Sequence, residues 1–368
     1  MTVPAGVFFT GLSHSDESPN NRVVDIEGAF ARIQRDGVNA SLELLDPINR
    51  RTDLNEAHIQ AIAACGLPAG NGSEVRDCVI ANWSRRPSGS MVSGPREGEA
   101  FRAVHQLYVS APSPGAERMD AERPGGIQIL GDVLAVPVER VAGSPAPWLV
   151  FYRVQGDGSM EPMDHLATQL RSSAASTAGL VRFKDRYVAA VGYGDRSVDF
   201  YVYKGGDNLY DPGGKFVHNG TFDEGKAIRH GWRPNEEWRG IEGGGALFAH
   251  ADLQLDSGPA LEPAIYLVTF NREGANSMSP GPDWACLYRV EYDPVQSNGE
   301  VQMTKLAELR LAFQGDLRFG PHCNWGAGIN ASPSGDALSI VVISRGTSAP
   351  GKEQLVENAL FSCCPTTA

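Results

Sequence analysis

One seven-residue pattern occurs twice in the chain and constrains the fold more than any other feature. Residues 148–154 and 284–290 both read W-x-x-[FL]-Y-R-V. Each copy follows a glycine-led apolar segment, which begins at Gly126 before the first copy and at Gly245 before the second. Such internal similarity is typical of architectures that repeat one supersecondary unit.

Similar glycine-led segments recur along the chain. They are anchored on Gly28, Gly126, Gly179, Gly245 and Gly328, so that successive units begin 98, 53, 66 and 83 residues apart. Between them, apolar and polar residues alternate with period two over short runs bounded by turn residues, as in half-buried antiparallel strands. The chain contains 42 glycines and 24 prolines, which suits many turns and few long helices.

In these features the chain resembles a β-propeller, at the level of repeat architecture and without a named family. The shared features are a small-residue entry, an inner strand, a turn and an aromatic second strand. The resemblance implies an all-β fold of five blades, with six as the next count. The alternative is a two-domain β-sandwich.

The predicted propeller domain covers residues 25–346, between an N-terminal segment (1–24) and a C-terminal segment (347–368). A helix and linker insertion is expected at about 46–125. The helix is predicted at 53–64, because Asp53 and Glu56 form a capping-box pattern and Gly66 stops the apolar run.

Composition limits the partners. Lys+Arg number 32 and Asp+Glu 44, a formal charge of −12 that disfavours nucleic acid as the main partner. No apolar run reaches the roughly 20 residues of a spanning helix, so no membrane association is expected. The N-terminus lacks the pattern of a secretory signal, which makes a cytoplasmic location the default.

Among the six cysteines, Cys65 and Cys78 bracket a Gly/Pro-rich stretch; free thiols and a disulfide both remain open.

If the propeller interpretation holds, the repeat entries bring remote polar side chains to the central channel. This predicted ring consists of Glu27, Gln128, Arg182, Glu242, His250, His322, Asn324 and Asn330. Such a ring suits a small-molecule site. The alternative is that these polar groups only form hydrogen bonds with one another and with water in the channel.

The leading hypothesis from the sequence is a small-molecule-processing enzyme: a hydrolase, lyase or isomerase. His250 and Asp252 alternate on one strand, and with His322 they are the candidate catalytic groups. A divalent metal ion held by His105, His250 and His322 would polarise a carbonyl or activate water.

The remaining candidate residues would bind substrate. Gln128, Arg182 and Asn324 are expected to position it, and Trp232 and Trp238 would stack on a sugar or flat ring. The rival hypothesis is a non-catalytic module that binds a glycan, peptide or protein on the same face. A scaffold without a ligand is the third class.

Overall fold

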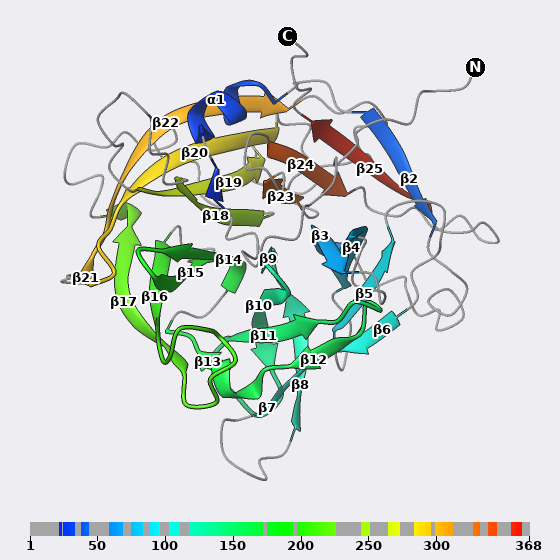
Figure 1. The fold of residues 1–368 in the computed structure, drawn as a ribbon, viewed down its shortest axis with the longest axis vertical. Helices are drawn as coiled ribbons and strands as arrows, with labels where there is room; N and C mark the ends of the chain where they lie inside the picture. Colours follow the sequence, from blue (N-terminus) through cyan, green and yellow to red (C-terminus); the bar gives the residue numbers. More distant parts are fainter. Residues whose placement is uncertain are drawn as a thin grey trace.

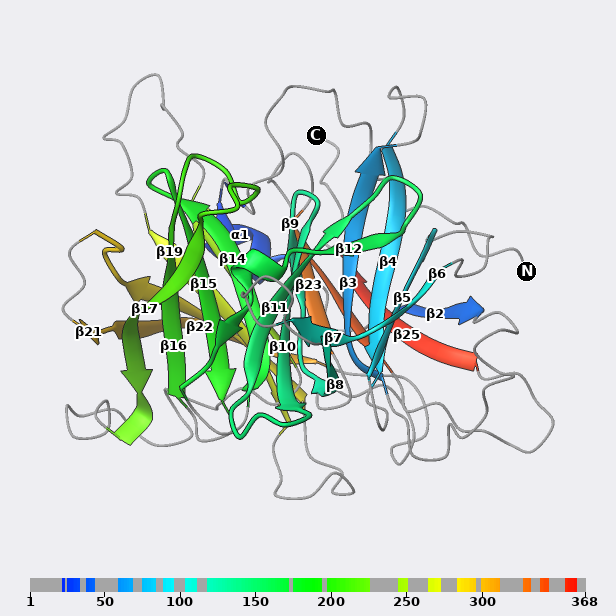
Figure 2. The ribbon, with the colours of Figure 1, turned by 90° about the horizontal axis from the view of Figure 1, so that it is seen from below.

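The protein is described from a computed structural model, and the fold is a ring of sheets around a central axis (Figure 1). Figure 2 shows the inner strands running roughly along that axis between two faces of the disc. The structure describes residues 22–23, 25–33, 38–43, 59–68, 75–83, 89–95, 103–110, 118–171, 175–193, 197–225, 244–250, 264–272, 283–295, 299–311, 327–331, 338–343 and 355–362.

Within these residues the strands form five sheets. The first contains β3 (Ile59–Pro68), β4 (Val75–Trp83), β5 (Ser90–Pro95) and β6 (Ala103–Gln106). The second contains β7 (Tyr108–Ser110), β8 (Arg118–Pro124), β9 (Gln128–Leu130), β10 (Val133–Val141), β11 (Trp148–Val154), β12 (Met160–Pro162) and β13 (Thr168–Gln169). A short 3-10 helix, η2 (Asp164–Leu166), precedes β13.

The other three sheets complete the ring. The third contains β14 (Ala175–Phe183), β15 (Arg186–Tyr193), β16 (Ser197–Lys204), β17 (Lys215–Asp223) and β21 (Gly299–Glu300). The fourth contains β1 (Arg22–Val23), β18 (Gly244–His250), β19 (Ile265–Arg272), β20 (Asp283–Glu291) and β22 (Gln302–Leu311). The fifth contains β2 (Val38–Glu43), β23 (Ala327–Ala331), β24 (Leu338–Ile343) and β25 (Leu355–Ser362).

The inner strands contact one another in a closed order: β9, β14, β18, β23, β3 and back to β9. Buried apolar side chains form four clusters in the described residues, and each cluster lies mainly between two sheets that are neighbours in this order. A β-sandwich would instead place its core between two stacked sheets. The predicted all-β, propeller-like fold is therefore confirmed.

The repeated heptapeptide occupies equivalent places in two sheets. Residues 148–154 form β11 and residues 284–290 lie in β20, and each is two strands away from the inner strand, β9 or β18, that contacts the neighbouring sheets. The sequence pattern predicted that the aromatic strand would be the second strand of each unit. In each sheet one further strand, β10 or β19, separates it from the inner strand.

The predicted helix is misplaced. Ile59–Ala64 of the expected helix lie in strand β3, where Ile62 and Ala63 pair with Ala81 and Ile80 of β4; residues 53–58 lie outside the described part. Pairing with β4 and burial of Ala63 outweigh the local helix pattern. The helix of the described residues is α1 (Ile26–Ala31), at the glycine expected to enter a strand, with Asp25 accepting from the Gly28 amide at 2.9 Å.

The predicted insertion and terminal segments also contribute strands to the ring. Strands β3–β6, within 46–125, make a sheet of their own. Strand β1 lies in the expected N-terminal segment and pairs with β18, and β25 lies in the expected C-terminal segment and pairs with β24. The fifth sheet also joins β2 to β25, so strands from the two ends of the chain share one sheet.

Candidate functional site

Gln128, a predicted substrate-binding residue, connects two inner strands. Its side-chain oxygen accepts a hydrogen bond of 2.8 Å from the amide of Leu180 in β14, and the residue is 3% exposed. The preceding Gly125 makes this close approach feasible, because a Cβ there would lie 2.3 Å from the carbonyl oxygen of Ser176. This confirms at one junction that small residues let inner strands crowd together.

Arg182 lies at the end of β14, half-buried beside the aromatic ring of Tyr187. Its guanidinium carbon is 5.7 Å from the ring centroid, and Nη2 is 3.9 Å from Asp185. Glu27 is exposed on α1 and Asn330 is half-buried on β23. The members of the predicted ring whose side chains are described thus lie on four different elements: β9, β14, α1 and β23.

The predicted metal ligands His105 and His250 lie in different sheets. His105 is on β6, the outermost strand of its sheet, whereas His250 ends β18, which lies between β1 and β19 in a sheet that is not adjacent in the ring. The structure does not bring these two residues together. In the described residues, no three His, Cys, Asp or Glu side chains are grouped to hold a metal ion.

The other predicted site residues lie outside the described residues: Asp252, His322, Asn324, Trp232, Trp238 and Glu242. For them, and for the side chain of His250, the roles given above stay predictions.

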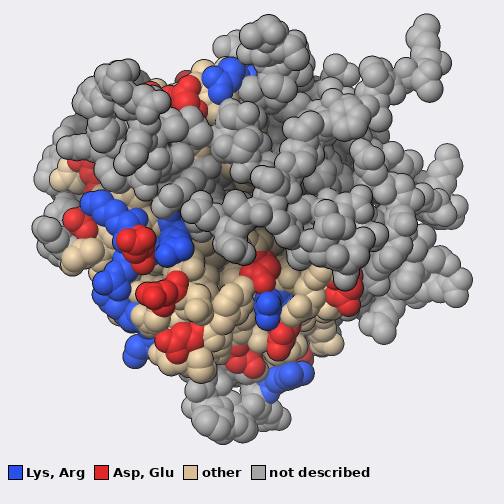
Figure 3. Space-filling view, viewed as in Figure 1, with Lys and Arg blue, Asp and Glu red and all other residues tan. Residues whose placement is uncertain are grey.

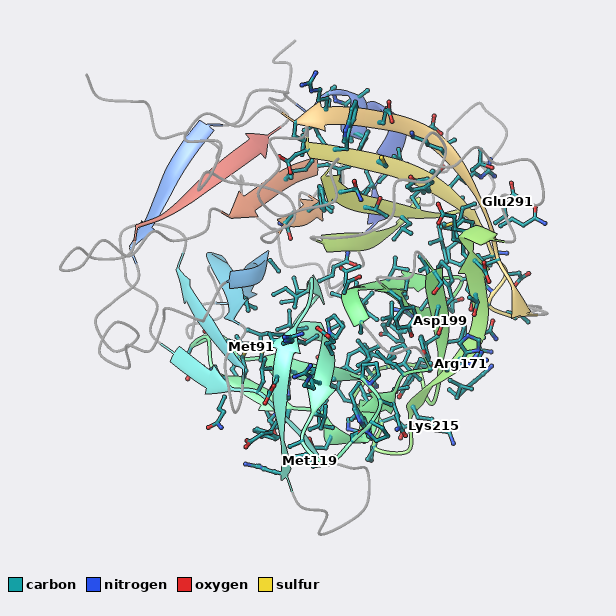
Figure 4. All side chains as sticks on the ribbon, turned by 180° about the vertical axis from the view of Figure 1, so that it is seen from behind. Met91, Met119, Arg171, Asp199, Lys215 and Glu291 are labelled. Atoms are coloured by element: carbon teal, nitrogen blue, oxygen red, sulfur yellow. The ribbon has the colours of Figure 1, made fainter. Side chains whose placement is uncertain are left out.

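A buried polar network, not anticipated from the sequence, lies in the third sheet where it meets the second (Figure 4). At its centre is Asp199 of β16, whose side chain is 7% exposed. One carboxylate oxygen accepts from Thr221 Oγ1 at 2.6 Å and lies 3.3 Å from His218 Nε2. The other accepts from the Tyr193 hydroxyl at 3.1 Å and from the Tyr201 hydroxyl at 3.5 Å. Both oxygens of this buried carboxylate are thus satisfied.

The network reaches the surface through His218 and Arg171. Arg171 follows β13 of the second sheet, and its Nη1 is 3.0 Å from His218 Nδ1. Burial raises the pKa of Tyr201 to about 12, and burial together with the Tyr201 hydroxyl and Asp199 raises that of Tyr193 further. Both phenols therefore stay protonated donors at neutral pH.

This arrangement does not form a nucleophilic relay. A relay needs the carboxylate on one imidazole nitrogen and the hydroxyl on the other. Here Asp199 and Thr221 both contact Nε2 of His218, and Arg171 Nη1 lies 3.0 Å from Nδ1 and 3.1 Å from Nε2. The hydrogen bonds of this network join the third sheet to the second. In the sequence, the network is indicated by an aspartate, Asp199, inside an aromatic strand. Asp199 is two residues before Tyr201, so the two side chains lie on the same face of the strand.

A second group of side chains lies at the strand ends that carry the β9–β10, β14–β15 and β16–β17 turns; we call this surface the hairpin face. Tyr210, in the loop between β16 and β17, is 43% exposed. Its hydroxyl donates to Asp132, which follows β9, and Arg153 at the end of β11 stacks 4.9 Å from its ring centroid. Arg153 also donates to Asp132 at 3.0 Å. Tyr210 is therefore held by two side chains of the neighbouring sheet.

The stems of the same loop carry exposed cations. Lys204 ends β16 and Lys215 begins β17, and the two are direct cross-strand partners. Arg186 lies two residues beyond the Val188–Val202 pair that joins β15 to β16, which places it in line with Lys204. We call these three exposed residues the basic row. Figure 3 shows Lys and Arg side chains gathered on this side of the molecule, with acidic side chains beside them.

The basic row lacks neutralising partners in the described part of the chain. No ion pair there involves Arg186, Lys204 or Lys215, whereas the nearby Lys184 lies 3.9 Å from Asp293. Like charges directly opposite each other on neighbouring strands destabilise a sheet. The Lys204–Lys215 pair is therefore unfavourable, and no described carboxylate lies within ion-pair distance of either lysine.

The comparisons with known proteins add little to this description. No family model matches the chain, and no curated protein matches it. Among solved structures, the N-terminal domain of Nup159 is similar at 11% identity, over 76% of this chain and 86% of that chain, with a TM-score of 0.24. The sheets and their order define the class, a β-propeller-like protein. None of the described helices is long and apolar enough to cross a membrane.

Proposed function

We propose that the protein is a non-catalytic recognition module that binds an acidic segment of a partner protein on the hairpin face. The observation that carries this proposal is the basic row, where Lys204 and Lys215 oppose each other without a described counterion. A carboxylate-rich segment would relieve that repulsion and gain charge-assisted hydrogen bonds. Departures from local stability rules are expected at functional sites.

The loop between the two lysines supports the proposal because it is preorganised. Asp211 accepts from the amides of Gly206 and Gly213 at 2.8 and 2.9 Å, and these hydrogen bonds lower the pKa of its carboxyl group. The Tyr203 hydroxyl donates to the carbonyl of Asn208 at 2.8 Å. A loop fixed before binding loses less conformational entropy when a partner docks.

Tyr210 supplies the apolar part of the proposed surface. Tyrosine and arginine are the side chains that most often dominate protein interfaces, and here Tyr210 is already stacked with Arg153. Because Lys204 and Lys215 flank the loop that carries Tyr210, one extended segment would contact both features. Although this protein carries a net negative charge, it would then bind an acidic partner through a local basic surface.

The test is fluorescence anisotropy with a labelled oligo-glutamate peptide and the full chain. We expect saturable binding that weakens as ionic strength rises from about 0.01 M to about 0.15 M, because the Debye length falls from about 30 Å to about 8 Å. Lys204→Glu/Lys215→Glu should weaken binding about tenfold or more, since like charges would then face the ligand.

The matched control changes the same net charge elsewhere. Arg118→Glu/Arg310→Glu alters exposed residues of β8 and β22, both outside the hairpin face, and should leave the peptide affinity nearly unchanged. Equal losses in the two double variants, or no binding by the native chain, would contradict the proposal. Tighter binding of a labelled single-stranded oligonucleotide than of the peptide would replace the acidic partner by nucleic acid and overturn it as well.

A further inference from the structure

The hairpin formed by β3 and β4 places two cysteines directly opposite each other. Cys65 of β3 is the cross-strand partner of Cys78 in β4. The register is unbroken around them: Ala64 pairs with Val79 on one side and Gly66 with Asp77 on the other. The two cysteines are separated by 12 residues in the sequence (66–77), so only the hairpin register brings them together.

Direct cross-strand positions satisfy the main geometric requirement of a disulfide. Opposed residues of an antiparallel pair share one face of the sheet, with Cα atoms about 4.5 or about 5.5 Å apart depending on the hydrogen-bonding pattern. Disulfides span Cα separations of about 4.4–6.8 Å, so neither strand would need to move. We propose that Cys65 and Cys78 form a disulfide that joins β3 to β4.

The other described cysteine is placed differently. Cys286 lies in β20 of the fourth sheet, is fully buried, and has Thr269 and Glu308 as its cross-strand partners. Its side chain packs among apolar side chains of the third and fourth sheets. Cys286 therefore serves as an internal reference for a buried cysteine outside the hairpin.

The bond would form by exchange with a low-molecular-weight disulfide such as oxidised glutathione. One cysteine thiolate attacks a sulfur of the oxidant, which forms a mixed disulfide and releases one glutathione thiolate. The second cysteine thiolate then attacks the protein sulfur of the mixed disulfide and releases the second glutathione. Two protein thiols are oxidised, one glutathione disulfide is reduced, and the two thiol protons pass to the two released glutathiones.

Peptide mapping of the native full chain tests the proposal without any substitution. The protein is equilibrated with oxidised glutathione, remaining thiols are blocked with iodoacetamide under denaturing conditions, and trypsin is added without reductant. Cleavage at Arg76 separates Cys65, in peptide 52–76, from Cys78, in peptide 77–85. We expect these two peptides to appear as one cross-linked species that a reductant splits, while Cys286 is alkylated throughout.

A second measurement uses the variant Cys65→Ser/Cys78→Ser. Reductant should lower the denaturant midpoint of the native chain and leave that of the variant unchanged, because a cross-link restricts the unfolded chain. Alkylation of both Cys65 and Cys78 in the oxidised sample would overturn the proposal. Cross-links from either residue to a cysteine outside the hairpin would overturn it too.

Discussion

At the scale of single residues, His105 shows how burial sets the charge of a side chain. Burial lowers the pKa of its imidazole, against smaller raising effects of a hydrogen bond to the Gly158 backbone and of Asp157. Its Nε2 is buried without a hydrogen-bond partner in the described residues. An imidazole that was a candidate metal ligand is therefore favoured in its neutral form, in contact with the turn between β11 and β12.

This predicts an acid-sensitive stability. A lowered folded-state pKa means that the unfolded chain binds more protons, so the contribution of His105 is present above the unfolded pKa of about 6.5 and is lost as pH falls through the folded value. The free energy of unfolding, measured by chemical denaturation, should fall as the pH is lowered from neutral to mildly acidic. In the variant His105→Gln this free energy should fall less steeply with pH. Parallel pH profiles for the two proteins would contradict the assignment.

At the scale of elements, the Asp199 network connects three strands of one sheet to the connector of the next. Tyr193, Asp199 and Thr221 come from β15, β16 and β17, and Arg171 comes from the segment between β13 and β14. Neighbouring sheets are otherwise held together largely by apolar packing. The network thus adds directional hydrogen bonds to a junction whose packing has no fixed register.

Asp199→Asn should destabilise the protein by about 1–3 kcal/mol, because a neutral amide of the same shape leaves buried donors without an acceptor. Thr221→Val removes one of those donors, so the double variant should cost less than the sum of the two single changes. Chemical denaturation of the four proteins measures this coupling. Strict additivity would show that the carboxylate does not act through Thr221.

The sequence predicted the repeating elements better than their positions. The heptapeptide at 148–154 and 284–290 correctly indicated equivalent strands, since aromatic and apolar residues must alternate between two sheet faces wherever the unit recurs. The helix at 53–64 was wrong because local capping and spacing do not register the pairing with β4. The Asp199 network and the basic row depend on residues from different strands, and their proximity follows from register, which one sequence does not specify.

At the scale of the whole molecule, the ring closes where the ends of the chain meet. Strand β2 pairs with β25 from Val38–Leu360 to Glu43–Leu355, so residues more than 300 positions apart become neighbours. Without this pairing the fifth sheet would lose its outermost strand, and β25 would become its exposed edge.

The most direct test of the closed ring is a cross-link between β2 and β25. Ser41 and Glu357 are direct cross-strand partners, and Ser41→Cys/Glu357→Cys should form a disulfide that peptide mapping assigns to these two positions. Ser41→Cys/Arg310→Cys, which places the second thiol on the fourth sheet, is the control and should stay unlinked. Efficient linkage of 41 to 357 alone is the result that the closed ring predicts, and failure of that linkage, or equal linkage in the control, would contradict it.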